Sequence, residues 1–163
     1  MNTKDAIRRS IESSDKIVGA YLGDLTDAEL LVRPLPGTNH IAWQLGHLIV
    51  SENRLMEAVV PGTMPKLPAG FAEKYTKDTA GSDDPKAFHS KDEYLRLMKE
   101  QRAGTLGILQ GFPDADLEKP APEQFRSFFP QVVDMFLLMG GHPMMHCGQW
   151  AVTRRKLGRK PLF

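Results

Sequence analysis

Four stretches of the chain repeat their apolar residues at intervals of three, four and seven positions, which is the period of an α-helix with one buried face. In chain order these stretches are approximately residues Thr3 to Leu22, Asn39 to Val60, Ser90 to Gly111 and Ser127 to Leu157. The alternation of apolar and polar residues that marks a β-strand is absent. The sequence therefore predicts an all-α fold built from four long helices.

Residues that begin and end helices stand at these boundaries. Asn39 suits the N-cap of the second helix, and the neighbouring His40 could cap that helix as well. Ser90-x-x-Glu93 is a capping box for the third helix. Gly158, after a cationic last turn, is a typical glycine at the end of the fourth.

The connection between the second and third helices is unusually long. It runs from Pro61 to His89 and is rich in Pro, Gly, Asp and Lys. Short loops make neighbouring helices antiparallel, whereas a crossover of this length lets the helices on either side run in the same direction. We expect a four-helix bundle with up-down-down-up topology, formed by a single domain over residues 1–163.

Composition indicates a globular protein and argues against several other classes. The chain has 163 residues, 41% of them hydrophobic, and a formal net charge of +1. No apolar run approaches the ~20 residues of a membrane span, and Met1 to Ser14 is unlike a secretory signal, so we expect no membrane association and a cytoplasmic location. The single cysteine, Cys147, cannot form an internal disulfide, and we interpret it as a packing residue.

His142 and His146 form an H-x3-H pair in the last helix. Residues four apart share one helix face, with Cβ atoms about 6 Å apart, so both imidazoles can point at one ion. His47 is the best third ligand: it lies about 10 Å from the start of the second helix, and His146 about 16 Å from the end of the antiparallel fourth, at 1.5 Å per residue. Three imidazoles leave a coordination position open, which is typical of a catalytic metal site.

Other residues near the three histidines are candidates for substrate contacts. Gln149 lies one turn beyond His146 and could orient a bound water or bind substrate, although a polar residue at the mouth of a bundle explains it equally well. Trp43 flanks His47, which places it either at the site or at an interface. Glu52 and Asp134 lie off the ligand faces and receive no catalytic role, and His89 is expected to be solvated.

Taken together, these residues resemble one family. Trp43-x3-His47 in an early helix, His142-x3-His146-x-Gly148-Gln149 in the last helix and the following Arg154-Arg155-x-Leu157-Gly158 resemble the DinB-like superfamily of four-helix-bundle metalloproteins. The resemblance implies one divalent ion, often zinc or nickel, held by His47, His142 and His146, and frequently a homodimer. Some members of that superfamily are transferases or isomerases that use a low-molecular-weight thiol.

Pro143 departs from the usual pattern of that family. A proline inside a helix loses the hydrogen bond to the residue four positions earlier and clashes with its carbonyl, so we expect a bend around Gly140-Gly141. Such a bend would change the direction of His142 more than that of His146.

The leading hypothesis is a metal-dependent enzyme, of thiol transferase, isomerase or hydrolase type, that acts on a small-molecule substrate. The alternative is a metal-binding stress-response protein without catalysis. Nucleic-acid binding through the cations around Arg154 is less well supported, since the net charge is close to zero and aromatic residues are not interleaved. We further expect the Pro61 to His89 connection to cover the histidine end of the bundle, and the protein to form a homodimer.

Overall fold

The computed structural model describes residues 1–162, and within that range the chain is all-α, as predicted. Its long helices are α1 (Thr3–Leu22), α3 (Ile41–Val59), α4 (Lys91–Gly111) and α5 (Val132–Lys156), and α2 (Asp27–Leu30) is a single turn. Five short 3-10 helices lie in the connections: η1 (Ala72–Tyr75), η2 (Lys77–Thr79), η3 (Pro85–Ala87), η4 (Asp114–Asp116) and η5 (Glu123–Phe125). Extended pairing over residues 1–162 is limited to one bridge, between Pro120 and Gln131.

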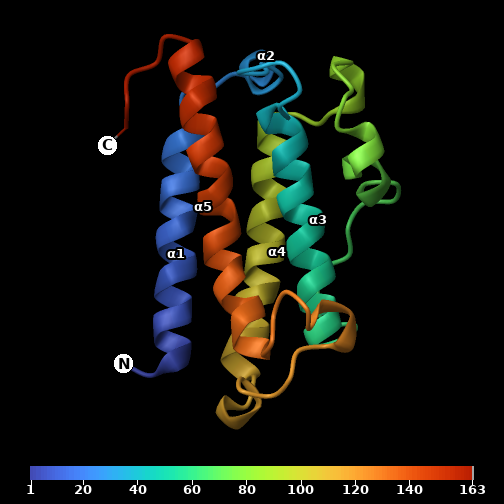
Figure 1. The fold of residues 1–163 in the computed structure, drawn as a ribbon, viewed down its shortest axis with the longest axis vertical. Coiled ribbons are helices and arrows are strands. Elements are labelled where there is room, and N and C mark those ends of the chain that lie inside the picture. The colour runs from blue at the N-terminus through green and yellow to red at the C-terminus, as the bar shows by residue number, and fades with distance from the viewer. Residues whose placement is uncertain (163) are drawn as a thin grey trace.

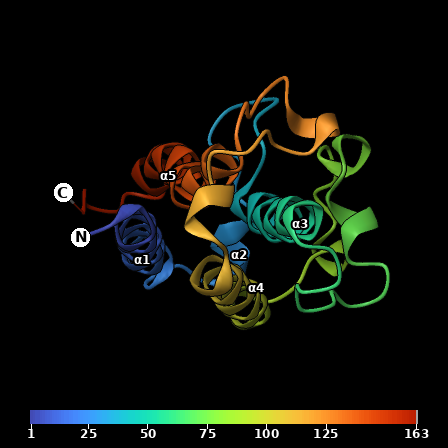
Figure 2. The ribbon, with the colours of Figure 1, turned by 90° about the horizontal axis from the view of Figure 1, so that it is seen from below.

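Followed by colour in Figure 1, α1 and α5 rise through the bundle while α3 and α4 descend. The contacts agree with these directions. Lys4 near the start of α1 donates to the carbonyl oxygen of Phe112 just beyond the end of α4 (2.7 Å), so α1 and α4 are antiparallel. Figure 2, a view from below, shows the four long helices side by side, with the connection between α3 and α4 on the outer side of α3.

The structure decides between two predicted caps and moves one helix start. Of Asn39 and His40, His40 is the N-cap of α3, and its Nδ1 accepts the backbone N–H of Trp43 at 3.1 Å. Helix α5 begins at Val132, five residues later than the predicted Ser127. Pro130 disfavours helical backbone in the residue before it, and the helix therefore starts only after Gln131 provides the cap.

Pro143 lies inside α5 and is buried, and the helix continues through it without interruption. The expected bend at Gly140-Gly141 remains a prediction. Gly140 itself is required for packing, because a Cβ at this position would lie 2.8 Å from the Ser10 hydroxyl of α1. This close approach fixes how α1 and α5 lie against each other.

The bundle contains two apolar clusters along its length. One, in the half of the bundle nearer α2, includes Leu22, Tyr94 and Trp150, and the other, toward the opposite end, includes Ile11 and Phe136. Each fully buried apolar side chain contributes about 1.5–3 kcal/mol relative to exposure. Along α3 and α4 the two clusters are separated by a buried polar group, Glu52, Arg102 and Thr105.

The connection between α3 and α4 packs against the outer side of α3. Phe71 and Tyr75 are 1% and 4% exposed, so they anchor the connection, and the Tyr75 ring lies directly over Gly46. A Cβ at Gly46 would be 2.1 Å from the Tyr75 ring, so only glycine fits there. The prediction that His89 is solvated is wrong. The side chain is partly buried, and its ring is stacked on Phe71 at 5.2 Å between centroids.

Candidate metal centre

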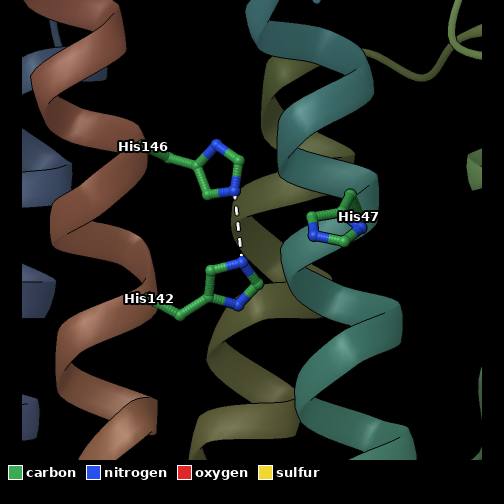
Figure 3. Close-up of side chains that lie close together, drawn as sticks. All are labelled: His47, His142 and His146. Atoms are coloured by element: carbon green, nitrogen blue, oxygen red, sulfur yellow. Dashed lines mark hydrogen bonds between the residues drawn. The ribbon is translucent and has the colours of Figure 1, made fainter. Parts of the chain in front are cut away.

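Three histidines from two antiparallel helices meet where the N-terminal half of α3 lies beside the middle of α5. His47 comes from α3, and His142 and His146 come from α5 (Figure 3). One ring nitrogen from each lies within 4.8 Å of the other two. The Nε2 atoms of His142 and His146 are 3.2 Å apart, and the His47 ring centroid is 5.1 Å from that of His142.

The sequence brings these side chains together in two ways. His142 and His146 are separated by one helical turn on the same face of α5. Because α3 runs against α5, a residue in the second turn of α3 reaches the middle of α5, and His47 is the histidine at that height. Pro143 does not turn His142 away, since the His142 ring faces the other two (Figure 3).

Gln44 fixes the orientation of His146. Its Oε1 accepts hydrogen bonds from Trp150 Nε1 (2.7 Å) and lies 2.8 Å from His146 Nδ1, while its Nε2 donates to the carbonyl oxygen of Asn39 (2.8 Å). Indole N–H groups only donate, so this amide has one possible orientation. His146 must therefore carry its proton on Nδ1, which leaves a free lone pair on Nε2 toward the cluster.

The indole of Trp43 supports His47. The two rings are stacked, 5.2 Å between centroids and 6° between planes. The indole N–H donates to the Thr79 hydroxyl in the connection, at 3.4 Å, and the Trp43 side chain is buried. Neither ring nitrogen of His47 has a hydrogen-bond partner among residues 1–162, so its lone pair is available to a ligand.

Burial keeps the three imidazoles neutral. It lowers the pKa of His47, and together with the neighbouring histidines it lowers the pKa of His142 and of His146 to about 4. The side chain of Gln149, although exposed, partly opposes this shift in His146 by hydrogen bonding. Neutral imidazole is the form that binds a metal ion.

The donor set fits a divalent ion. Two nitrogens bound at 2.0–2.1 Å around a tetrahedral ion lie about 3.3 Å apart, close to the 3.2 Å between the Nε2 atoms of His142 and His146. Over residues 1–162, this is the group of histidine, cysteine or acidic side chains whose spacing could hold a metal ion. No carboxylate takes part in it.

The remaining candidates lie elsewhere. His40 caps α3, as the sequence allowed, and its Nε2 lies 3.2 Å from the carbonyl oxygen of Ser82, so it is not a ligand. Cys147 is buried, and burial raises the pKa of its thiol to about 12, which agrees with a packing role. Asp134 accepts the backbone N–H of Gln131 and caps α5.

The cations near the end of α5 are largely occupied by contacts within the chain. Arg154 is buried and pairs with Asp24, and Arg159 pairs with Glu29 at 2.7 Å. These pairs tie the end of α5 to the turn around α2. In the described residues, no helix is long and apolar enough to cross a membrane.

Of the two polar residues beside the histidines, the sequence prediction missed Gln44 and considered Glu52 without identifying its partner. Gln44 lies three positions before His47, and this spacing predicts that both side chains lie on the same side of the helix. Glu52 reaches the interior of the bundle next to Arg102, and only the position of α4 reveals that partner.

A four-helix bundle with three clustered histidines on antiparallel helices defines a class of candidate metal-binding proteins. Within this class, the chain belongs to the DinB superfamily, whose family model matches residues 12–150 and so includes all three histidines. A crystal structure described as that of the conserved protein of locus from Enterococcus faecalis is similar, with a TM-score of 0.71 and 15% identity over 98% of this chain and 99% of that one. At that identity the likeness concerns the fold. No curated protein matches the chain.

Proposed function

We propose that this protein is a divalent-metal-dependent enzyme that acts on a small-molecule substrate, of the thiol transferase, isomerase or hydrolase type. The observation that carries the proposal is the cluster of His47, His142 and His146, with ring nitrogens within 4.8 Å of one another. Membership of the DinB superfamily supports a metal site in this place.

The residues around the cluster have separate tasks in this proposal. His47, His142 and His146 bind the ion through neutral nitrogens, and Gln44 holds the Nδ1 proton of His146 so that Nε2 faces the ion. Trp43 fixes the plane of the His47 ring. In this proposal Gln149 contacts the substrate, which its exposed side chain next to His146 supports.

A bound divalent ion would polarise a substrate carbonyl and hold a water or a thiol in its deprotonated form. Three protein ligands leave room for one such group. Imidazole ligands suit zinc and nickel equally well, and either ion is compatible with the proposal. A low-molecular-weight thiol as co-substrate would use that same position.

A second candidate is a metal-binding stress-response protein without catalysis. The observation in its favour is that the group consists of histidines alone, so within residues 1–162 no carboxylate stands among the ligands to act as a general base on a group bound beside them. A thiolate nucleophile needs no such base once it is deprotonated, and for that reason we favour thiol transfer over hydrolysis.

The test begins with protein purified without a histidine tag. We expect about one divalent ion per chain by elemental analysis, and loss of that ion in His146→Ala with the helical circular dichroism retained. His89→Ala, which removes an imidazole outside the cluster, is the control and should keep the ion. Full metal content in a His47→Ala, His146→Ala double variant would exclude the assignment.

Catalysis is tested separately on the metal-loaded protein. The zinc and nickel forms are assayed for conjugation of low-molecular-weight thiols to electrophiles and for hydrolysis of esters and amides. Metal-dependent turnover in either assay supports an enzyme. Stoichiometric metal without turnover in any of them would favour the binding protein.

A further inference from the structure

A buried carboxylate lies behind the histidine cluster. Glu52 of α3 is 8% exposed, and its Oε1 accepts hydrogen bonds from Arg102 (3.0 Å) and from the Thr105 hydroxyl (2.6 Å). Arg102 also donates to Asp15 of α1 at 3.1 Å. Two carboxylates thus share one guanidinium, and the second oxygen of Glu52 accepts no hydrogen bond from residues 1–162.

A small cavity is lined both by this carboxylate and by one histidine of the cluster, His142. Its volume is about 10 Å³, and its polar lining comes from Glu52, Arg102 and His142, while Leu48 and Met139 are among the apolar residues around it. A cavity of roughly 10–15 Å³ accommodates one water when polar groups line it. The cavity is therefore suited to a single bridging water.

The hydrogen bonds of the cluster determine which nitrogen of His142 carries a proton and which carries a lone pair. Because His146 carries its proton on Nδ1, its Nε2 can only accept, and the contact of 3.2 Å requires His142 to donate from Nε2. The Nδ1 of His142 points away from His146 (Figure 3) and has no partner among residues 1–162. Holding an ion requires the opposite tautomer, with Nε2 bare and the proton on Nδ1.

We propose that one water in the cavity links Nδ1 of His142 to Glu52, and that Glu52 is a positioning residue that stabilises the metal-binding tautomer of His142. Without an ion, the water donates to Nδ1 and to the carboxylate. With an ion, Nδ1–H donates to the water, which still donates to the carboxylate. The proton on Nε2 is lost to solvent and Nδ1 takes up one from solvent, so the number of protons is unchanged and His142 stays neutral throughout.

This inference rests on the proposed metal site and assigns Glu52 a part in it. A carboxylate behind a ligating imidazole makes the imidazole more basic, and losing such a partner typically weakens metal binding 10–100-fold. The carboxylate also places negative charge near the dication. Asp15 shares the same guanidinium but does not line the cavity, which makes it the matched control.

The first experiment measures Zn²⁺ affinity by competition with a chromophoric chelator. Glu52→Gln keeps the shape of the side chain and removes its charge, and we expect it to bind Zn²⁺ about 10–100-fold more weakly than the wild type. Asp15→Asn should stay within about threefold of the wild type. Unchanged affinity in Glu52→Gln, or an equal loss in both variants, would overturn the proposal.

The second experiment follows the tautomer of His142 by ¹⁵N NMR of the imidazoles. The wild type should carry the proton on Nε2 without metal and on Nδ1 with Zn²⁺, and a proton on Nδ1 in both states would contradict the inference. If the wild type binds no Zn²⁺, the proposed function fails by itself. A crystal structure of the metal-free protein then still tests the water. Electron density for a water is expected between Glu52 and His142, and the absence of such density would reject the water-mediated contact.

Discussion

At the level of single residues, Gln44 has the most consequences for the site. It is the only protein partner of His146 Nδ1 and of the Trp150 indole within the described chain, and all three side chains are buried or partly buried. Gln44→Met keeps the size of the side chain but removes the acceptor. Each unsatisfied buried group costs about 1–3 kcal/mol, so we expect a lower midpoint in urea unfolding.

Metal affinity in Gln44→Met should fall as well, by about 10–100-fold, since His146 loses the group that fixes its tautomer. Gln44→Glu provides the comparison, because its carboxylate can still accept from both donors. It should retain more of the affinity. Equal affinity in wild type and Gln44→Met would show that the tautomer of His146 does not depend on this contact.

The pH dependence follows from the histidine pKa values. Burial lowers the pKa of His142 and His146 to about 4, whereas an unfolded chain has a histidine pKa near 6.5. The unfolded state therefore takes up protons first, and the metal-free protein should lose stability as the pH falls from about 6.5 to about 4, with no histidine effect above that window.

Metal binding should persist to lower pH than for exposed histidines. We expect half occupancy below about pH 5, because the imidazoles stay neutral down to their lowered pKa values. Zn²⁺ titrations from pH 7 to 4 measure this. Loss of binding near pH 6.5 would mean that the three rings are more solvated than their burial indicates.

At the level of elements, the connection between α3 and α4 depends on one close approach. The Tyr75 ring occupies the space that a side chain at Gly46 would fill. The hydroxyl of Tyr75 also forms a hydrogen bond of 2.8 Å with the hydroxyl of Tyr94 in α4. Gly46→Ala should displace the connection and destabilise the protein by about 1–3 kcal/mol. Limited proteolysis should then cut within residues 61–89 faster than in the wild type.

Gly107→Ala is the matched control, since no atom lies within 4 Å of a Cβ there and alanine favours the helix. It should leave proteolysis unchanged and raise stability slightly. If Gly46→Ala behaves in the same way, Tyr75 is free to move and does not hold the connection in place.

The helices could be predicted because their signals are local. Capping at Ser90, periodicity in α1 and the H-x3-H spacing in α5 all lie within a few turns of one helix. The late start of α5 at Val132 was missed because Pro130 acts against an apolar pattern that continues upstream. The pairing of Glu52 with Arg102 depends on side-chain contacts between two helices 50 positions apart, which no spacing rule reveals.

The site was predictable only in part for the same reason. Helical spacing placed His142 beside His146, and the long crossover placed His47 at their height. Trp43 was expected to face either the site or an interface, and the structure buries it between His47 and Thr79. The connection between α3 and α4 supplies Thr79 and so covers Trp43. Its path over α3 depends on Gly46, and no periodic pattern in the sequence predicts that path.

At the level of the whole molecule, we predict a homodimer, although the argument from Trp43 no longer applies because that side chain is covered within the chain. Exposed apolar residues instead recur at intervals of seven and eight positions along the outward face of α5. They are Leu137, Met144, Met145 and Val152, between 38% and 67% exposed. An exposed apolar face of this kind is typical of an interface, and one self-complementary patch suffices for a closed two-fold pair.

Light scattering at micromolar concentration should give about twice the 18.2 kDa of the chain. A Met145→Glu, Val152→Glu variant should give the single-chain mass, while Leu95→Glu, on an exposed apolar position of α4, should leave the dimer intact. A wild-type mass of 18.2 kDa would reject the dimer and leave the α5 face as ordinary surface.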